Sequence, residues 1–170
     1  MSTLKVDQIQ LANGNTPTIN DLGINDTGTV LQVKTAVHST ETNISTAGTY
    51  VDTGLSLSIT PTSTSSKILV IYSMQFRMKS TSGDVGMGFR LVRGSTGIDT
   101  PTTSYDNYTY DGGDSTDHRQ SDTEFYLDSP ATTSATTYKV QMISYNGTGA
   151  NARTQSDGNK SRIMLMEIAG

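Results

Sequence analysis

The densest group of side chains capable of chemistry lies between Tyr105 and Asp122, in the stretch YDNYTYDGGDSTDHRQSD. Tyrosine combines a rigid ring with a polar hydroxyl, and carboxylates accept hydrogen bonds, so the two types together suit recognition of a glycan or a protein. The alternatives are a solvated loop whose tyrosines pack locally and a contact with another protein subunit. The candidate contact residues are Tyr105, Tyr108, Tyr110, Asp111, Asp114, Asp117 and His118.

Three carboxylates in this stretch, Asp111, Asp114 and Asp117, offer oxygen ligands of the kind that calcium prefers. Their spacing does not match the EF-hand loop, which places ligands at alternate positions and closes with a glutamate. We therefore interpret them as an acidic, solvated turn. We expect neither a metal nor any other cofactor in this protein.

Catalytic patterns are weak. Asp122 and Glu124 are one residue apart and share a strand face, and paired carboxylates hydrolyse glycosidic bonds, but acidic residues are also ordinary on a solvent face. His38, at the end of an expected strand, and His118, in the expected loop, lie outside any nucleophile motif. We expect a protein that is not an enzyme, with a polysaccharide depolymerase as the distant alternative.

Composition narrows the class further. The chain of 170 residues has no cysteine, so it has neither disulfides nor thiolate metal sites, which fits synthesis in a reducing cytoplasm. Its formal net charge is −4 and its twelve basic residues are scattered, which argues against nucleic-acid binding. The N-terminus does not resemble a secretory signal, and no apolar run is long enough for membrane insertion.

The elements that must position these residues are strands. Leu31, Val33 and Val37 recur at alternate positions, which predicts a strand with one buried face. Similar short runs, separated by polar turns, begin near residues 51, 67, 85, 123, 136 and 162, and no apolar stripe has helical spacing. The sequence predicts an all-β protein, an antiparallel β-sandwich or jelly roll formed by residues 29–170.

Residues 1–28 differ from the rest, because brief apolar pairs alternate with turn signals such as Asn-Gly and Thr-Pro. We interpret them as an extended N-terminal arm that anchors the head domain to a larger structure. The apolar anchors expected to dock by strand addition or in grooves are Leu4, Val6, Ile9, Leu11, Ile19, Leu22 and Ile24.

Two segments, KILVIY from Lys67 and RIMLMEI from Arg162, are apolar on both faces. In a sandwich, each sheet has only one of its faces covered by the other sheet. An exposed apolar patch would therefore remain on the other face unless a second copy of the chain covers it. We therefore predict a symmetric homo-oligomer and favour three copies. The predicted trimer interface consists of Ile68, Leu69, Val70, Ile71, Tyr72, Ile163, Met164, Leu165, Met166 and Ile168.

A family resemblance is carried by four runs: TYVDTGLSLSITPTSTSSKILVIYSMQF, FRLVRGSTGI, TTYKVQMISYNG and the closing MLMEIAG. Together they resemble the C-terminal domain of tail-fibre and other virion proteins of tailed phages, especially marine cyanophages. The opening MSTLKVDQIQ is similar to the N-terminus of many such proteins. These motifs are strand patterns rather than chemistry.

The resemblance implies a trimeric, tumour-necrosis-factor-like jelly roll, with KILVIY and RIMLMEI side by side and facing a threefold axis. It further implies a virion structural protein assembled in the bacterial host cytoplasm, anchored to other virion proteins through its arm and contacting a host-surface glycan or protein. No long shaft separates arm and head, so a fibre tip, a head fibre and a capsid decoration protein that stabilises the shell all remain open.

Overall fold

A computed structural model describes residues 14, 16, 27–44, 46–81, 83–101, 105–110, 112–145 and 150–170. The seven apolar residues predicted to anchor the N-terminal arm lie outside this part of the chain, as does Asp111. The prediction that residues 1–28 form an arm therefore stays a prediction.

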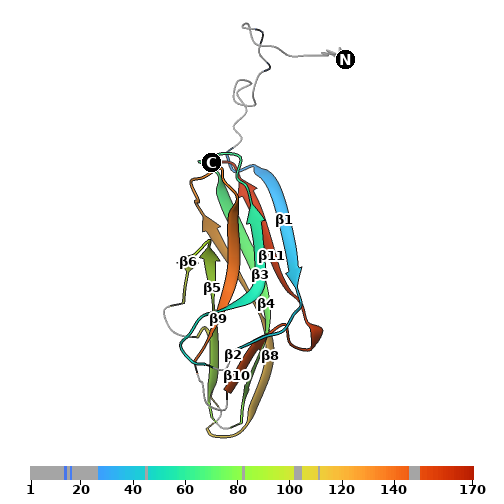
Figure 1. Cartoon of the computed structure of the whole chain (residues 1–170), viewed down its shortest axis with the longest axis vertical. Helices are drawn as coiled ribbons and strands as arrows, with labels where there is room; N and C mark the ends of the chain where they lie inside the picture. Colours follow the sequence, from blue (N-terminus) through green and yellow to red (C-terminus); the bar gives the residue numbers. More distant parts are fainter. Residues whose placement is uncertain are drawn as a thin grey trace, which may run out of the picture.

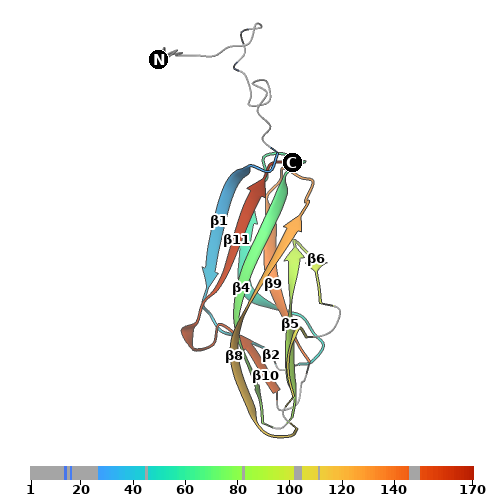
Figure 2. The same ribbon diagram turned by 180° about the vertical axis from the view of Figure 1, so that it is seen from behind.

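The described residues form an all-β structure of two antiparallel sheets packed face to face as a β-sandwich (Figures 1 and 2). The strands are β1 (Val30–His38), β2 (Thr42–Ile44), β3 (Val51–Ile59), β4 (Lys67–Ser80), β5 (Val85–Arg93), β6 (Thr96–Asp99), β7 (Asn107–Thr109), β8 (Thr116–Asp128), β9 (Thr136–Ser144), β10 (Ala150–Thr154) and β11 (Ser161–Ile168). One short 3₁₀ turn, η2 (Ser156–Gly158), joins β10 to β11.

The first sheet is organised around β4, the longest strand. One edge of β4 pairs with β8, and its other edge pairs first with β11 and then with β10. Beyond these, β1 pairs with β11 and β2 pairs with β10. The second sheet has the order β3-β9-β5, with β6 and β7 on the far edge of β5. The expected adjacency of KILVIY and RIMLMEI is confirmed, because β4 and β11 are hydrogen-bonded neighbours.

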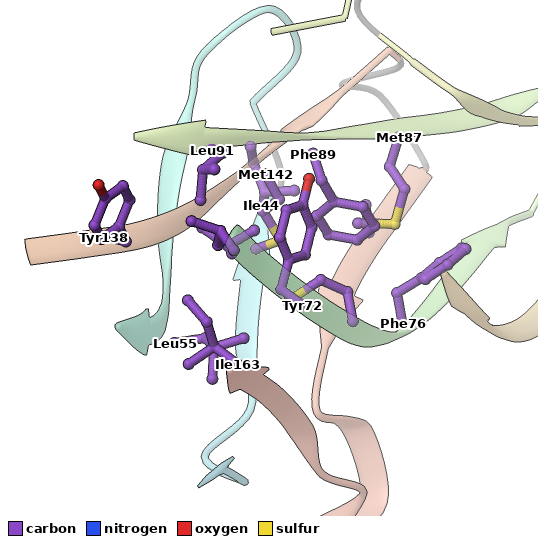
Figure 3. Close-up of a cluster of buried hydrophobic side chains, with 14 of the residues drawn as sticks. Ile44, Leu55, Tyr72, Phe76, Met87, Phe89, Leu91, Tyr138, Met142 and Ile163 are labelled. Atoms are coloured by element: carbon purple, nitrogen blue, oxygen red, sulfur yellow. The ribbon is translucent and has the colours of Figure 1, made fainter. Parts of the chain in front are cut away.

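Alternation along β4 explains the core. Every second residue is buried, and these side chains face the second sheet: Ile68, Val70, Tyr72, Met74, Phe76 and Met78. Phe76 meets Phe89 of β5 edge to face with ring centroids 5.5 Å apart, which joins the two sheets (Figure 3). Each such side chain contributes roughly 1.5–3 kcal/mol on burial.

The stretch expected to be one loop, 105–122, contains strand structure. Strand β7 lies within it, and β8 begins at Thr116, so His118 and Asp117 belong to β8 rather than to a loop. The ladder with β4 runs the full length from Ser80–Thr116 to Ile68–Asp128. Polar residues are tolerated there because β8 is an edge strand with solvent on its free side, a position that its composition alone does not reveal.

Two acidic side chains are buried in the sandwich with their hydrogen bonds satisfied. Asp128 of β8 accepts hydrogen bonds from Arg93 at 2.7 and 2.8 Å and from the Tyr138 hydroxyl at 2.6 Å, which ties the two sheets together. Glu167 of β11 accepts hydrogen bonds from the Gln32 amide at 2.6 Å and from the Thr62 amide and hydroxyl at 2.6 and 2.7 Å. Although burial acts in the opposite direction, these donors lower the pKa of Glu167 to about 2.

We predict that Glu167→Gln lowers the free energy of unfolding by about 2 kcal/mol at pH 7, since hydrogen bonds to a charged group are lost. Because the folded-state pKa is depressed, this stabilisation is complete above the ordinary pKa of 4.5 and is lost as pH falls toward 2. Urea unfolding at a fixed protein concentration, at pH 7 and near pH 2, measures the difference. Glu41→Gln, at an exposed ion pair with Arg153, should change stability little at either pH. An equal loss for Glu167→Gln at both pH values would contradict the assignment.

Candidate functional site

The outer face of the first sheet is apolar although no part of the described chain covers it. The β4–β11 register places Leu69 beside Met166 and Ile71 beside Met164, and these four side chains point away from the core. They are partly exposed, in contrast to the fully buried residues that alternate with them. We call this surface, with its continuation onto β1 and β8, the apolar face.

Strands β1 and β8 widen the apolar face on both sides. In β1 the alternation was predicted correctly, but its apolar side faces outward: Val33 and Val37 are 52% and 57% exposed, while Ala36 turns toward the core. In β8, Phe125 pairs with Ile71 and is 75% exposed. The apolar side chains of the apolar face are Val30, Val33, Val37, Leu69, Ile71, Phe125, Leu127, Met164, Met166 and Ile168.

The predicted interface residues divide between the two faces. Leu69, Ile71, Met164, Met166 and Ile168 lie on the apolar face. The other half of the set is covered by the second sheet of the same chain and cannot touch another copy, which corrects the prediction for Ile68, Val70, Tyr72, Ile163 and Leu165. The sequence showed that both faces were apolar but not which face belonged to the core.

A shallow groove of about 370 Å³ crosses the apolar face where β1, β11 and β4 meet. Val37, Ile71 and Met164 give it an apolar lining, and Arg162 and Ser73 lie at its more polar part. Phe125 stands beside Ile71, next to this groove. One copy of the chain thus carries both a projecting aromatic ring and an apolar recess.

Two tyrosines of the predicted recognition stretch, Tyr105 and Tyr108, pack locally on the outer side of the second sheet. Tyr105 stacks on Tyr108 with centroids 4.7 Å apart, and Tyr145 meets both rings edge-on at 4.8 and 5.6 Å. The cluster lies over Gly86 and Gly88 of β5, where an added Cβ would come within 2.9 Å of Tyr108 and 3.2 Å of Tyr105. These alternate glycines in VGMGF make room for the rings.

Within the predicted recognition stretch, the structure separates the candidate residues. Tyr110 is 75% exposed and stands apart from the tyrosine cluster, and the Tyr108 hydroxyl donates to Asp84. Asp117 is held by Arg77 across the β4–β8 ladder, which lowers its pKa. Asp114 and His118 are exposed. Among the described residues, no three acidic or histidine side chains are arranged to hold a metal ion.

An acidic pocket lies between the sheets at the β8 edge. Asp122 and Glu124 share a face of β8, as predicted, but that face turns toward the sandwich, opposite Met74 and Tyr72 of β4. With Asp99, Pro101, Asp106, Tyr72 and Phe89 they line a cavity of about 150 Å³. Burial raises the pKa of Asp106 and of Glu124, and the neighbouring carboxylates add to both shifts.

His38 has a structural position at the end of β1. Its ring lies over Gly54 of β3, where an added Cβ would be 2.3 Å from Nε2. Gly54 also has a φ of 83°, which favours glycine. Neither His38 nor His118 has an aspartate partner or a serine nucleophile among the described contacts.

Comparison of the chain with models of protein families and with curated proteins finds no match. The described part of the chain contains no helix long and apolar enough to span a membrane.

We predict that Gly86→Val destabilises the chain by about 1–3 kcal/mol, because the new side chain displaces Tyr108 and Tyr105 from β5. The matched control is Ser56→Val, on the exposed outer side of β3 in the same sheet. Thermal unfolding, together with the near-ultraviolet circular dichroism of the tyrosines, measures the effect. Equal stability of the two variants would show that the cluster does not need the glycine.

Proposed function

We propose that this protein is a non-enzymatic structural protein of a phage virion, which assembles as a homotrimer through the apolar face. One observation carries the proposal: a surface spanning four strands presents apolar side chains, with Phe125 75% exposed and Val37 57% exposed. Soluble proteins rarely leave so continuous an apolar surface uncovered. In a homo-oligomer, a second copy of the same chain would cover this face.

The strand order supports a jelly roll as the finer description of the sandwich. One sheet has the order β1-β11-β4-β8 and the other the order β3-β9-β5 followed by β6 and β7. This alternation of strands between two sheets is the arrangement expected for the tumour-necrosis-factor-like domain that the sequence resembles. In that arrangement, β4 and β11 belong to the sheet that faces the threefold axis.

The positions of Phe125 and the groove favour a ring of copies. The ring of Phe125 lies beside the groove lined by Val37 and Met164, on the same face of one chain. When the projecting residue of one copy enters the groove of the next, the contact is head-to-tail, and such contacts close into a ring under rotational symmetry. Three copies are the number that the family resemblance implies.

The arm of residues 1–28 would attach each trimer to other virion proteins, and the head would contact the host surface. Binding through three heads strengthens a weak single contact by multivalency. The exposed Tyr110 is the residue of the predicted recognition stretch that is best placed for such a contact. The alternative is a capsid decoration or head-fibre protein that uses the same trimer to stabilise the shell.

The acidic pocket bears on the more distant alternative, a polysaccharide depolymerase. Its carboxylates gather in one place, and the raised pKa of Glu124 is the kind of shift that a general acid needs. However, its volume of about 150 Å³, below the roughly 300–1,000 Å³ typical of ligand pockets, leaves room for a small molecule but not for a polysaccharide chain. A polymer substrate would need an open groove, so binding rather than hydrolysis is the better supported activity.

We predict that Phe125→Asp converts the trimer into monomers. A charge placed in a dry interface costs about 3 kcal/mol, or more than a hundredfold in association. Sedimentation equilibrium measures the mass. Tyr110→Asp is the matched control, because Tyr110 is also an aromatic residue that is 75% exposed, and it should leave the trimer intact. A well-folded parent protein that sediments as a monomer would defeat the proposal.

We predict that removal of residues 1–28 leaves a trimer that no longer joins the virion. Sedimentation of the truncated protein checks assembly, and electron microscopy of labelled particles checks incorporation. Label on fibre tips supports the host-contact function, whereas label across the shell supports capsid decoration. Incorporation of the truncated protein at the parental level would refute anchoring through the arm.

A further inference from the structure

The acidic pocket contains a buried tyrosine, Tyr72, in addition to the polar side chains expected at the edge of a sheet. Tyr72 of β4 is only 3% exposed, and its ring extends from β4 toward β5, beside Phe89 (Figure 3). Its side chain lines the pocket, and no side chain or backbone group of the described residues hydrogen-bonds to its hydroxyl. The hydroxyl is not sealed in the core but opens onto the pocket, so it is available to hydrogen-bond with a ligand there.

The carboxylates around Tyr72 are not neutralised by the chain. None of Asp99, Asp106, Asp122 and Glu124 takes part in an ion pair of the described residues. Asp122 accepts one hydrogen bond, from the Asn107 side-chain amide at 3.1 Å. The pKa values of Asp106 and Glu124 are raised by partial desolvation and by the neighbouring carboxylates, although both residues remain exposed and the Phe89 backbone hydrogen bond offsets part of the shift of Asp106. A bound cation would relieve the repulsion between these carboxylates.

The lining indicates which kind of cation fits. A hard metal ion needs several oxygen ligands at 2.3–2.6 Å around one point. No three acidic side chains of the described chain are so arranged. The pocket instead combines two aromatic rings and Pro101 with carboxylates. Aromatic faces attract organic cations, and carboxylates form charge-assisted hydrogen bonds with their N–H groups.

We propose that the acidic pocket binds a small molecule bearing a protonated primary amine. The ammonium group lies among Asp106, Asp122 and Glu124 and donates a hydrogen bond to the Tyr72 hydroxyl. The carbon skeleton of the ligand packs against Phe89 and Pro101. An aliphatic diamine and an amino sugar share this chemistry.

Isothermal titration of the full-length protein with putrescine and with glucosamine tests the proposal and separates the two sources. We expect at least one of these amines to bind, and glucose, which lacks the charge, not to bind. Glu124→Gln and Asp106→Asn should each weaken binding about tenfold, and Tyr72→Phe by a smaller factor, since it removes a hydrogen-bond acceptor that carries no charge of its own. Thermal melting confirms that each variant is folded.

Asp114→Asn is the matched control, because it removes an exposed carboxylate outside the pocket and should leave the affinity unchanged. Failure of both amines to bind at millimolar concentration would overturn the proposal. So would equal affinity in Glu124→Gln, Asp106→Asn and the parent protein, or calcium binding that neither amine displaces. If Asp114→Asn lost as much amine affinity as the pocket variants, the effect would reflect net charge alone, and the proposal would also be overturned.

Discussion

The antiparallel ladder between β4 and β11 is the contact on which the remaining structure depends. Its inward pairs, such as Val70 with Leu165, form the centre of the core, and its outward pairs, such as Ile71 with Met164, form the centre of the apolar face. The hydrogen bonds of the ladder fix which side chains share a side, because a shift of one residue would exchange the two sets. The second sheet covers only the inward-facing set of side chains. The core of the fold and the centre of the apolar face thus come from one pair of strands.

The sequence predicted the all-β class and the main strands, because alternation is written residue by residue in segments such as 55–59 and 74–78. It also identified the two strands that are apolar on both sides. It did not identify which side faces the core, since Val33 and Leu165 are equally apolar and only the packing of the second sheet distinguishes them. The exposure of Phe125 was not predicted either, because the sequence of β8 does not show which side of the strand faces the core.

Features that depend on contacts between distant segments of the chain could not be predicted from local sequence patterns. The polar residues of β8 form a strand because β4 offers them a partner along its full length, and nothing in their composition predicts that. The sequence did not explain the alternate glycines of β5, because Tyr105 and Tyr108, which lie above them, come some twenty residues later in the chain. The acidic pocket likewise gathers Asp99, Asp106 and Glu124 from separate segments.

The two ends of the described sandwich meet at one place: the Gly28 amide donates to the Ala169 carbonyl at 2.8 Å, and the Ala169 amide donates to the Thr29 carbonyl at 2.9 Å. When the opposite end of the sandwich is held, a pull on the N-terminal end of β1 along the strand loads the β1–β11 ladder in shear. Under such shear the hydrogen bonds of this ladder carry the load together instead of breaking one after another. The sandwich would therefore resist a pull along β1 better than a pull across it.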